Sequence, residues 1–270
     1  MVGRVLIVTT SHDKLGDTGK PAGSWVEEVA SPYYAWRKKG YEAVETHVRK
    51  AHSHKCASAG GKIPFDPASE EGDFKTPEAG TFMEDKEAQE LVNNSKSVTE
   101  VTEGAAEHYD AIFLPGGHGI ATRWDEDAMY VMLRFLQQLK AHLEDRPLFD
   151  GPTSKELKQL VEAFWNGGKI VSAVCHGPNG LVSATGPDGN PIVKGKRVTG
   201  FANTEEVAVA KDKAVPFLLE DKLKELGGIF SKADADWASH VVSDGNLITG
   251  QNPGSSKAVA DAVIAAISSR

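Results

Sequence analysis

Three short hydrophobic runs without polar alternation constrain the fold more than any other feature of this sequence. They cover residues 5–9, 110–115 and 169–174, and each ends in polar or glycine-rich residues. A strand that lacks alternation is buried on both faces, as in parallel sheets that helices cover. The runs therefore predict an α/β protein with a mainly parallel sheet and helices on both faces.

The remaining elements are predicted from periodicity and from glycine and proline. Pro32 is expected to disturb the first helix, and a sharp turn at Cys175 is expected to open a helix that reaches Ala184. Residues 57–80 read as a long loop. Helices are predicted over 24–39, 84–94, 126–143, 154–165, 216–226 and 255–268, and further strands over 41–48, 197–200, near Val241 and over 247–249.

Length and composition narrow the class of protein. A chain of 270 residues with 40% hydrophobic residues can form a single α/β domain over 1–270. The 30 basic against 38 acidic residues give a net charge of −8, which argues against binding to nucleic acid or anionic membranes. Two cysteines are too few for a disulfide framework, and no targeting or membrane-spanning segment is visible. We therefore expect a cytoplasmic protein.

Cys175 and His176 carry the strongest chemical signal. They follow a hydrophobic strand and precede Gly177 and Pro178, as in the nucleophile elbow of hydrolases with sulfur in place of oxygen. A helix N-terminus at this point would lower the thiol pKa, so we expect a thiolate near neutral pH. His176 is a candidate acid or base. A buried cysteine is more often inert, but its placement here favours catalysis.

Residues 116–119, Gly-Gly-His-Gly, follow the second of the three hydrophobic runs. Glycines let backbone amides approach a substrate oxygen, so this turn is a candidate part of an oxyanion hole. His118 is equally well explained as a ligand or as a turn residue.

Two acidic pairs are candidates for partners of the thiol and the imidazole. Glu27 and Glu28 open the first helix, where acids complement the helix dipole, but a buried one could bond the sulfur. Glu205 and Glu206 occupy a possible first helical turn, and one of them could orient His176.

His52, His54 and Cys56 form a third group of chemically interesting residues. Their types suit zinc, but three ligands within five residues and no distant fourth favour a solvated loop. A disulfide between Cys56 and Cys175 is not expected.

Five motifs in this order resemble the ThiJ/PfpI (DJ-one-like) superfamily, and within it the glutathione-independent glyoxalase, or glyoxalase III, branch that overlaps with heat-shock chaperones. The resemblance spans nearly the whole chain. The motifs are Glu28 with Pro32 and Gly40, Leu114-Pro-Gly-Gly-His-Gly119, Ala173-Val-Cys-His-Gly-Pro178, Val198-Thr-Gly-Phe201 before Glu205-Glu206, and Thr249-Gly-Gln-Asn-Pro253.

The resemblance implies a flavodoxin-like α/β sandwich that forms a homodimer. It implies Cys175 as nucleophile with His176 as partner and Glu28 as the carboxyl against the sulfur. Glu205 is the implied third triad member, although a shift of one residue selects Glu206. The amides of Gly117 and His176 are the implied oxyanion hole.

Two departures from the family pattern affect what can be expected. Residues 124–153 look like a helical insertion over the site or at a subunit contact. Larger relatives hold zinc through a His and a Glu, but Trp36 and Tyr41 stand at the corresponding positions here. We therefore expect no metal and no cofactor.

The implied reaction converts methylglyoxal, a small dicarbonyl, to lactate with water alone. Two alternatives remain open. One is peptide or amide hydrolysis of the PfpI type, with glutamine amidotransfer ranked lower because no distant H-x-E pair is present. The other is a holding chaperone whose cysteine senses oxidation.

Overall fold

A seven-stranded sheet forms the centre of the molecule. The computed structural model describes residues 3–47, 62–121 and 154–270. The strand order is β3-β2-β1-β4-β5-β9-β8, and only the β8–β9 pair is antiparallel. The strands are β1 (Arg4–Thr9), β2 (Glu42–His47), β3 (Lys96–Ser97), β4 (Ala111–Leu114), β5 (Ile170–Val174), β8 (Val241–Asp244) and β9 (Leu247–Gly250).

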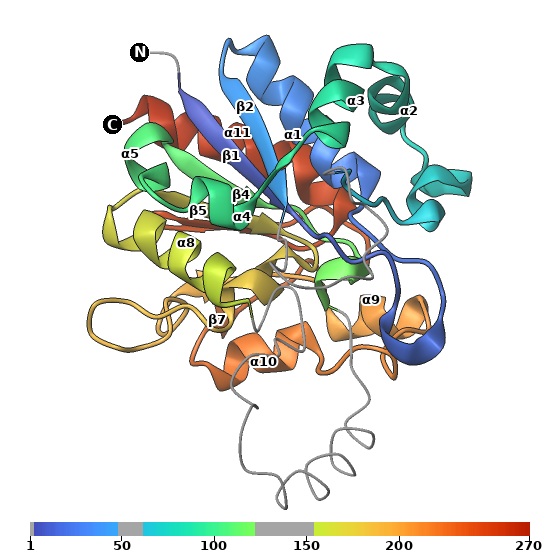
Figure 1. Cartoon of the computed structure of the whole chain (residues 1–270). Helices are drawn as coiled ribbons and strands as arrows, with labels where there is room; N and C mark the ends of the chain where they lie inside the picture. The colour runs from blue at the N-terminus through green and yellow to red at the C-terminus, as the bar shows by residue number, and fades with distance from the viewer. Residues whose placement is uncertain (1–2, 48–61, 122–153) are drawn as a thin grey trace, which may run out of the picture.

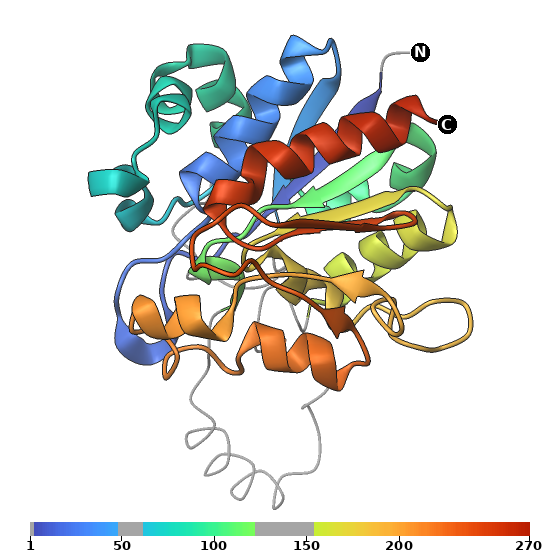
Figure 2. The ribbon, with the colours of Figure 1, turned by 180° about the vertical axis from the view of Figure 1, so that it is seen from behind.

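Helices cover both faces of this sheet, which confirms the predicted fold class. The pair α1 (Val26–Lys38) and α11 (Ser256–Ser268) lies on one face (Figure 2), and α4 (Val98–Val101), α5 (Ala105–His108) and α8 (Lys155–Asn166) lie on the other (Figure 1). The helices α2 (Pro77–Glu84) and α3 (Lys86–Asn93) lie outside α1.

A smaller unit packs beside β8 and β9 at one edge of the sheet. It contains the parallel pair β6 (Arg197–Val198) and β7 (Ile229–Phe230) with α9 (Asn203–Ala208) and α10 (Leu219–Glu225). Six short 3-10 helices complete the described chain: η1 (Gly16–Thr18), η2 (Pro67–Glu70), η3 (Gly72–Phe74), η4 (His118–Ala121), η5 (Gly177–Leu181) and η6 (Pro253–Ser255).

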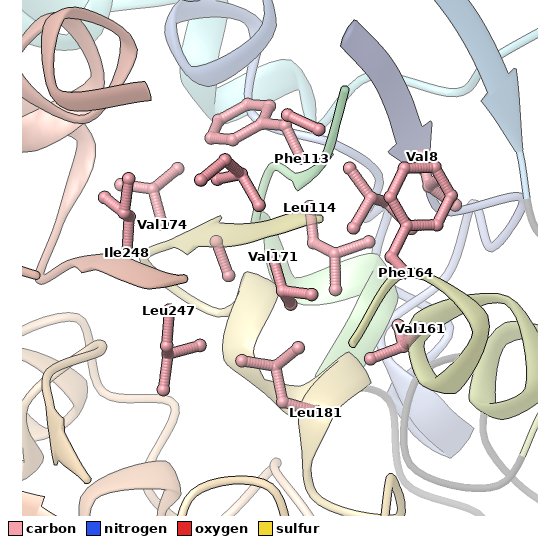
Figure 3. Close-up of a cluster of buried hydrophobic side chains, with 14 of the residues drawn as sticks. Val8, Phe113, Leu114, Val161, Phe164, Val171, Val174, Leu181, Leu247 and Ile248 are labelled. Atoms are coloured by element: carbon pink, nitrogen blue, oxygen red, sulfur yellow. The ribbon is translucent and has the colours of Figure 1, made fainter. Parts of the chain in front are cut away.

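The core explains why the hydrophobic runs lack alternation. Every residue of β4 and of β5 is buried, because both faces of these strands meet helices. Figure 3 shows side chains of β4, β5, β9 and α8 gathered in one cluster, among them Phe113, Val171 and Phe164. The burial of these side chains fixes the strands whose ends carry the site.

Two predicted helices differ from the structure. The single helix expected over 84–94 is the second of two helices, because Asp85 ends α2 and its side chain accepts the Glu87 and Ala88 amides that open α3. The helix expected after Cys175 is the five-residue 3-10 helix η5.

Pro32 lies inside α1 and is buried, yet the helix continues through it to Lys38. Pro32 therefore does not end or restart this helix, contrary to what the sequence had suggested. The predicted insertion at 124–153 and the His52, His54 and Cys56 group lie outside the described residues. None of the helices in the described ranges combines the length and hydrophobicity needed to cross a bilayer.

Candidate active site

Cys175 lies at the end of β5 in a backbone conformation that few residues adopt. Its φ is +57°, and its N–H donates to Gly250 O while its carbonyl accepts the Phe201 N–H. A positive φ is costly for a residue with a side chain, and such strain is concentrated at functional sites. The two hydrogen bonds to neighbouring segments hold the elbow and fix where the sulfur lies.

The imidazole of His176 connects the sulfur to an acid. Nδ1 lies 3.4 Å from Cys175 Sγ, and Nε2 lies 2.6 Å from Glu206 Oε2. Contacts with both imidazoles hold the pKa of Glu206 well below its usual range, although burial alone would raise it. The ionised carboxylate accepts a hydrogen bond from the Nε2–H of His176, which leaves a lone pair on Nδ1 facing the thiol.

Of the two adjacent acids at the start of α9, the structure brings the second to His176. Glu206, and not Glu205, contacts His176. The neighbouring Glu205 is also buried, but it accepts hydrogen bonds from loop residues: the amides of Ala202 and Trp237 and the side chains of Gln251 and Asn252. Glu205 therefore ties together the loops around the site.

His118 is the second imidazole on Glu206. Its Nε2 lies 2.8 Å from Oε1, and its Nδ1 lies 3.1 Å from Lys211 Nζ, which in turn lies 3.6 Å from Asp66. Burial, with the nearby His176, lowers the pKa of His118 to about 3. His118 is therefore neutral, with Nδ1 accepting from Lys211 and Nε2 donating to Glu206.

His118, His176 and Glu206 also have ligand types that a divalent metal takes, and their ligand atoms lie within 4.8 Å of one another. The nitrogen–oxygen distances of 2.8 and 2.6 Å are those of hydrogen bonds. Lys211 adds a positive charge beside His118, which disfavours a second cation. We interpret the cluster as a hydrogen-bond network. Trp36, at a position where relatives were expected to hold zinc, is fully buried in the core.

Glu28 approaches the sulfur from the first turn of α1. The side chain is completely buried, and Oε2 accepts the Gly116 N–H at 2.6 Å. Oε1 has no hydrogen-bond partner among the described residues, and the carboxyl interacts with the Cys175 thiol. Burial raises the pKa of Glu28 to about 8. At neutral pH this carboxyl therefore carries a proton that it can donate.

Gly116 makes this approach possible, because a Cβ there would lie 2.5 Å from His176 N and 2.8 Å from Glu28 Oε2. The amide of Gly117 hydrogen-bonds the sulfur. The expected oxyanion donors, the amides of Gly117 and His176, thus belong to two loops that meet beside Cys175.

Burial favours the protonated thiol of Cys175 and not the thiolate that the sequence predicts. Cys175 is only 4% exposed, and burial raises the pKa of its thiol, with the Glu28 carboxylate adding to the rise when it is ionised. A five-residue 3-10 helix offers little dipole to oppose this. The resting site therefore has a protonated thiol next to a base, rather than a free thiolate.

Several residues in this network had no predicted role. Gln251 and Asn252 follow the buried strand β9 at the same sheet edge, a placement that the sequence could have flagged. Asp66 and Lys211 lie in segments with no motif, and only the folded chain brings them to His118.

The sequence and the fold of this chain are similar to those of known proteins. The model of the DJ-1/PfpI family matches residues 151–266. Glyoxalase 3 of Candida albicans is 28% identical, with 98% of each chain covered, and its crystal structure, titled glyoxalase III, superposes with TM-score 0.75 at 26% identity over 98% and 97% of the chains. The glutathione-independent glyoxalase HSP31 of Saccharomyces cerevisiae is 27% identical over 95% of this chain and 94% of its own.

Two further crystal structures are more similar in sequence. One is 37% identical over the whole of both chains, with TM-score 0.77. The other, the Rapid Encystment Protein of 24 kDa from Francisella tularensis, is 30% identical over 98% and 99% of the chains, with TM-score 0.79. The elbow motif and the fold agree with the family match: residues 151–266 form a DJ-1/PfpI family domain.

Proposed function

We propose that this protein is a glutathione-independent glyoxalase that converts methylglyoxal to lactate, with Cys175 as the nucleophile. Relatives that carry this activity in their names are 27–28% identical over nearly the full length of both chains. The observation that carries the proposal is the continuous contact from Cys175 Sγ through His176 to Glu206, with the Glu28 carboxyl also on the sulfur.

The first step is addition of the sulfur to the aldehyde carbon. His176 Nδ1 takes the thiol proton as the carbon–sulfur bond forms, and Glu206 stabilises the imidazolium. The aldehyde oxygen becomes an alkoxide, for which the amides of Gly117 and His176 are the nearby donors. Because the thiol is protonated at rest, this base is needed for the attack.

The second step moves hydrogen from the former aldehyde carbon to the ketone carbon through an enediolate. His176 first returns the thiol proton to the alkoxide and then removes the proton from the first carbon. Glu28, protonated at neutral pH, supplies a proton to the second carbon and regains one from the hydroxyl group on the first carbon as the thioester carbonyl forms. The imidazolium protonates the former ketone oxygen, so that both side chains return to their starting states. The product is a lactoyl thioester on Cys175. Water then releases lactate and restores the thiol.

The overall reaction adds one water to methylglyoxal. One carbon is oxidised and its neighbour is reduced, so electrons balance within the substrate. The chemistry proposed here therefore calls for neither glutathione nor a redox cofactor.

The test is lactate formation from methylglyoxal by the purified protein in buffer without any thiol, measured by proton NMR. We expect turnover by the wild type and none above background in Cys175→Ala. Lactate formation at the wild-type rate in Cys175→Ala would reject the mechanism. Absence of lactate with the wild type would reject the function.

The structure bears on the two alternatives unequally. A thiol that is 4% exposed suits a dicarbonyl of a few atoms better than a polypeptide, which needs an open cleft. Peptidase activity therefore ranks below the glyoxalase reaction. Activity as a holding chaperone stays a separate prediction. The test is whether the Cys175→Ala variant suppresses the aggregation of an unfolded protein.

The oligomeric state and the cellular location of the protein can each be tested. We propose a homodimer, as the family resemblance implies, so light scattering should give twice 28.9 kDa, or 57.8 kDa. A mass of one chain at micromolar concentration would contradict this. The cytoplasmic location inferred from cysteine usage stays a prediction for localisation by microscopy.

A further inference from the structure

Four aromatic side chains form an arc between the two loops that hold the catalytic groups. Trp25 and Phe74 have ring centroids 5.2 Å apart, Phe74 and Trp237 6.1 Å, and Trp237 and Phe201 5.8 Å. The arc ends at the site on both sides. The Trp25 amide donates to Gly116 O at 3.3 Å, and the Phe201 ring lies 4.4 Å from the His176 ring.

The outer part of this aromatic arc is open to solvent. Phe74 and Trp237 are each 39% exposed, whereas Trp25 and Phe201 are 8% and 4% exposed. Only two other large hydrophobic residues of the described chain, Val207 and Ile229, are as exposed. Exposed aromatic rings that continue inward to a nucleophile are typical of the entrance to a binding site.

Trp237 is held in place at a cost. Its φ of +66° is unfavourable for a residue with a side chain, and its N–H donates to Glu205 Oε1 at 2.9 Å. Glu205 is itself fixed by Gln251 and Asn252. A buried carboxylate therefore holds the backbone that keeps the exposed indole of Trp237 beside Phe201. Packing alone does not explain this arrangement.

The arc also contains an unused hydrogen-bond donor. Trp25 is more than nine-tenths buried, and its indole N–H has no partner among the described residues. An unsatisfied buried donor is costly unless a ligand uses it. The arc thus offers apolar ring surface together with one donor.

We propose that the aromatic arc is a specificity subsite that binds a flat apolar substituent on the 2-oxoaldehyde, so that the enzyme accepts aryl-substituted substrates well. This inference rests on the proposed function. The rings of the arc meet edge to face, with interplanar angles of 86°, 64° and 60°, and an aryl group of the substrate extends that arrangement. Methylglyoxal, with only a methyl group, makes little use of it.

The experiment compares kcat/KM for phenylglyoxal and for methylglyoxal in the full-length protein. Trp237→Gly removes the ring at a backbone angle that glycine accepts, so the fold is retained. We expect the ratio of phenylglyoxal to methylglyoxal kcat/KM to fall about fivefold in Trp237→Gly and in Phe74→Ala. Trp237→Phe, which keeps a ring, should retain most of the ratio. Ile229→Ala, at an exposed hydrophobic residue outside the arc, should keep the wild-type ratio.

A binding measurement separates this inference from the proposed function. Calorimetry with phenylglyoxylate and with pyruvate uses the same 2-oxoacid group with and without an aryl ring. Tighter binding of phenylglyoxylate that is lost in Trp237→Gly supports the arc even if neither aldehyde is turned over. Equal binding of the two acids, or an unchanged kcat/KM ratio in both ring-removing variants, overturns it. So does a Trp237→Gly variant that loses only the ability to suppress aggregation of an unfolded protein, because the occupant is then a polypeptide.

Discussion

Two adjacent glutamates show what residue type alone leaves open. Glu205 and Glu206 are the same residue in the same helical turn, and both are buried. Successive side chains on a helix point about 100° apart, so one reaches His176 and the other reaches Trp237, Gln251 and Asn252. The sequence predicted an acid at this turn, but it could not predict the helix rotation that decides between them.

The exchange of these two acids for amides separates their roles. We expect Glu206→Gln to lower kcat by about two to three orders of magnitude, because the imidazolium loses its carboxylate. Glu205→Gln should instead lower stability by about 2 to 3 kcal/mol, since four N–H donors face Glu205. A low kcat in Glu205→Gln together with a wild-type kcat in Glu206→Gln would instead identify Glu205 as the triad member.

The protonation of Glu28 makes a pH-dependent prediction for stability. The pKa rises from 4.5 to about 8 on folding, because burial disfavours the charged form. The folded state therefore holds a proton that the unfolded state releases, and stability falls as pH rises from about 4.5 to 8. Glu28→Gln removes this loss and should be more stable than the wild type at pH 8.5, by on the order of 1 to 3 kcal/mol, while its activity falls.

Thermal unfolding of both proteins at pH 5 and pH 8.5 measures this effect. The stability advantage of Glu28→Gln should be largest at the higher pH. An advantage that does not change with pH would mean that Glu28 ionises normally in the folded protein.

At the scale of elements, the buried strands were predictable and their ends were less so. The runs at 5–9, 110–115 and 169–174 became β1, β4 and β5 because both-face burial leaves a plain hydrophobic signature. The turn after β5 was predicted, but its 3-10 form was not. That form depends on how closely the turn packs against β4, which no local pattern encodes.

This packing gives a prediction at Gly177, the first residue of η5. A Cβ there would lie 2.0 Å from the Leu114 carbonyl oxygen, so the elbow cannot keep its position with alanine. We expect Gly177→Ala to lower the free energy of unfolding by about 2 to 4 kcal/mol and to abolish activity. Gly189→Ala is the matched control, because Gly189 has open space and only its φ of +75° opposes a side chain. Chemical denaturation measures both, and equal small losses would contradict the close contact.

At the scale of the whole molecule, the site depends on contacts between distant segments. His118 follows β4, Glu206 lies in α9, and Asp66 and Lys211 come from loops with no motif. Such contacts follow from topology, because the carboxyl ends of parallel strands gather loops at one edge of the sheet. The sequence predicted the edge and the nucleophile there, but not the loops that complete the site.

Lys211 tests how far this network extends. It donates to His118 Nδ1 and so keeps the His118 Nε2 proton directed at Glu206. Lys211→Met frees His118 to adopt the other tautomer, and we expect kcat to fall about fivefold to tenfold as Glu206 is repositioned. Lys213→Met, at a lysine that is 93% exposed, should leave kcat at the wild-type value. Equal kcat in Lys211→Met and Lys213→Met would mean that Lys211 does not belong to the network that affects catalysis.

Every step of the proposed reaction requires a covalent bond between Cys175 and the substrate during turnover. The most direct measurement is mass spectrometry of the peptide that contains Cys175 after acid quenching of the protein during steady-state turnover of methylglyoxal. We expect an adduct with the mass of one methylglyoxal on Cys175, which disappears when the substrate is exhausted. Continued lactate production with Cys175 unmodified at every time point would contradict it.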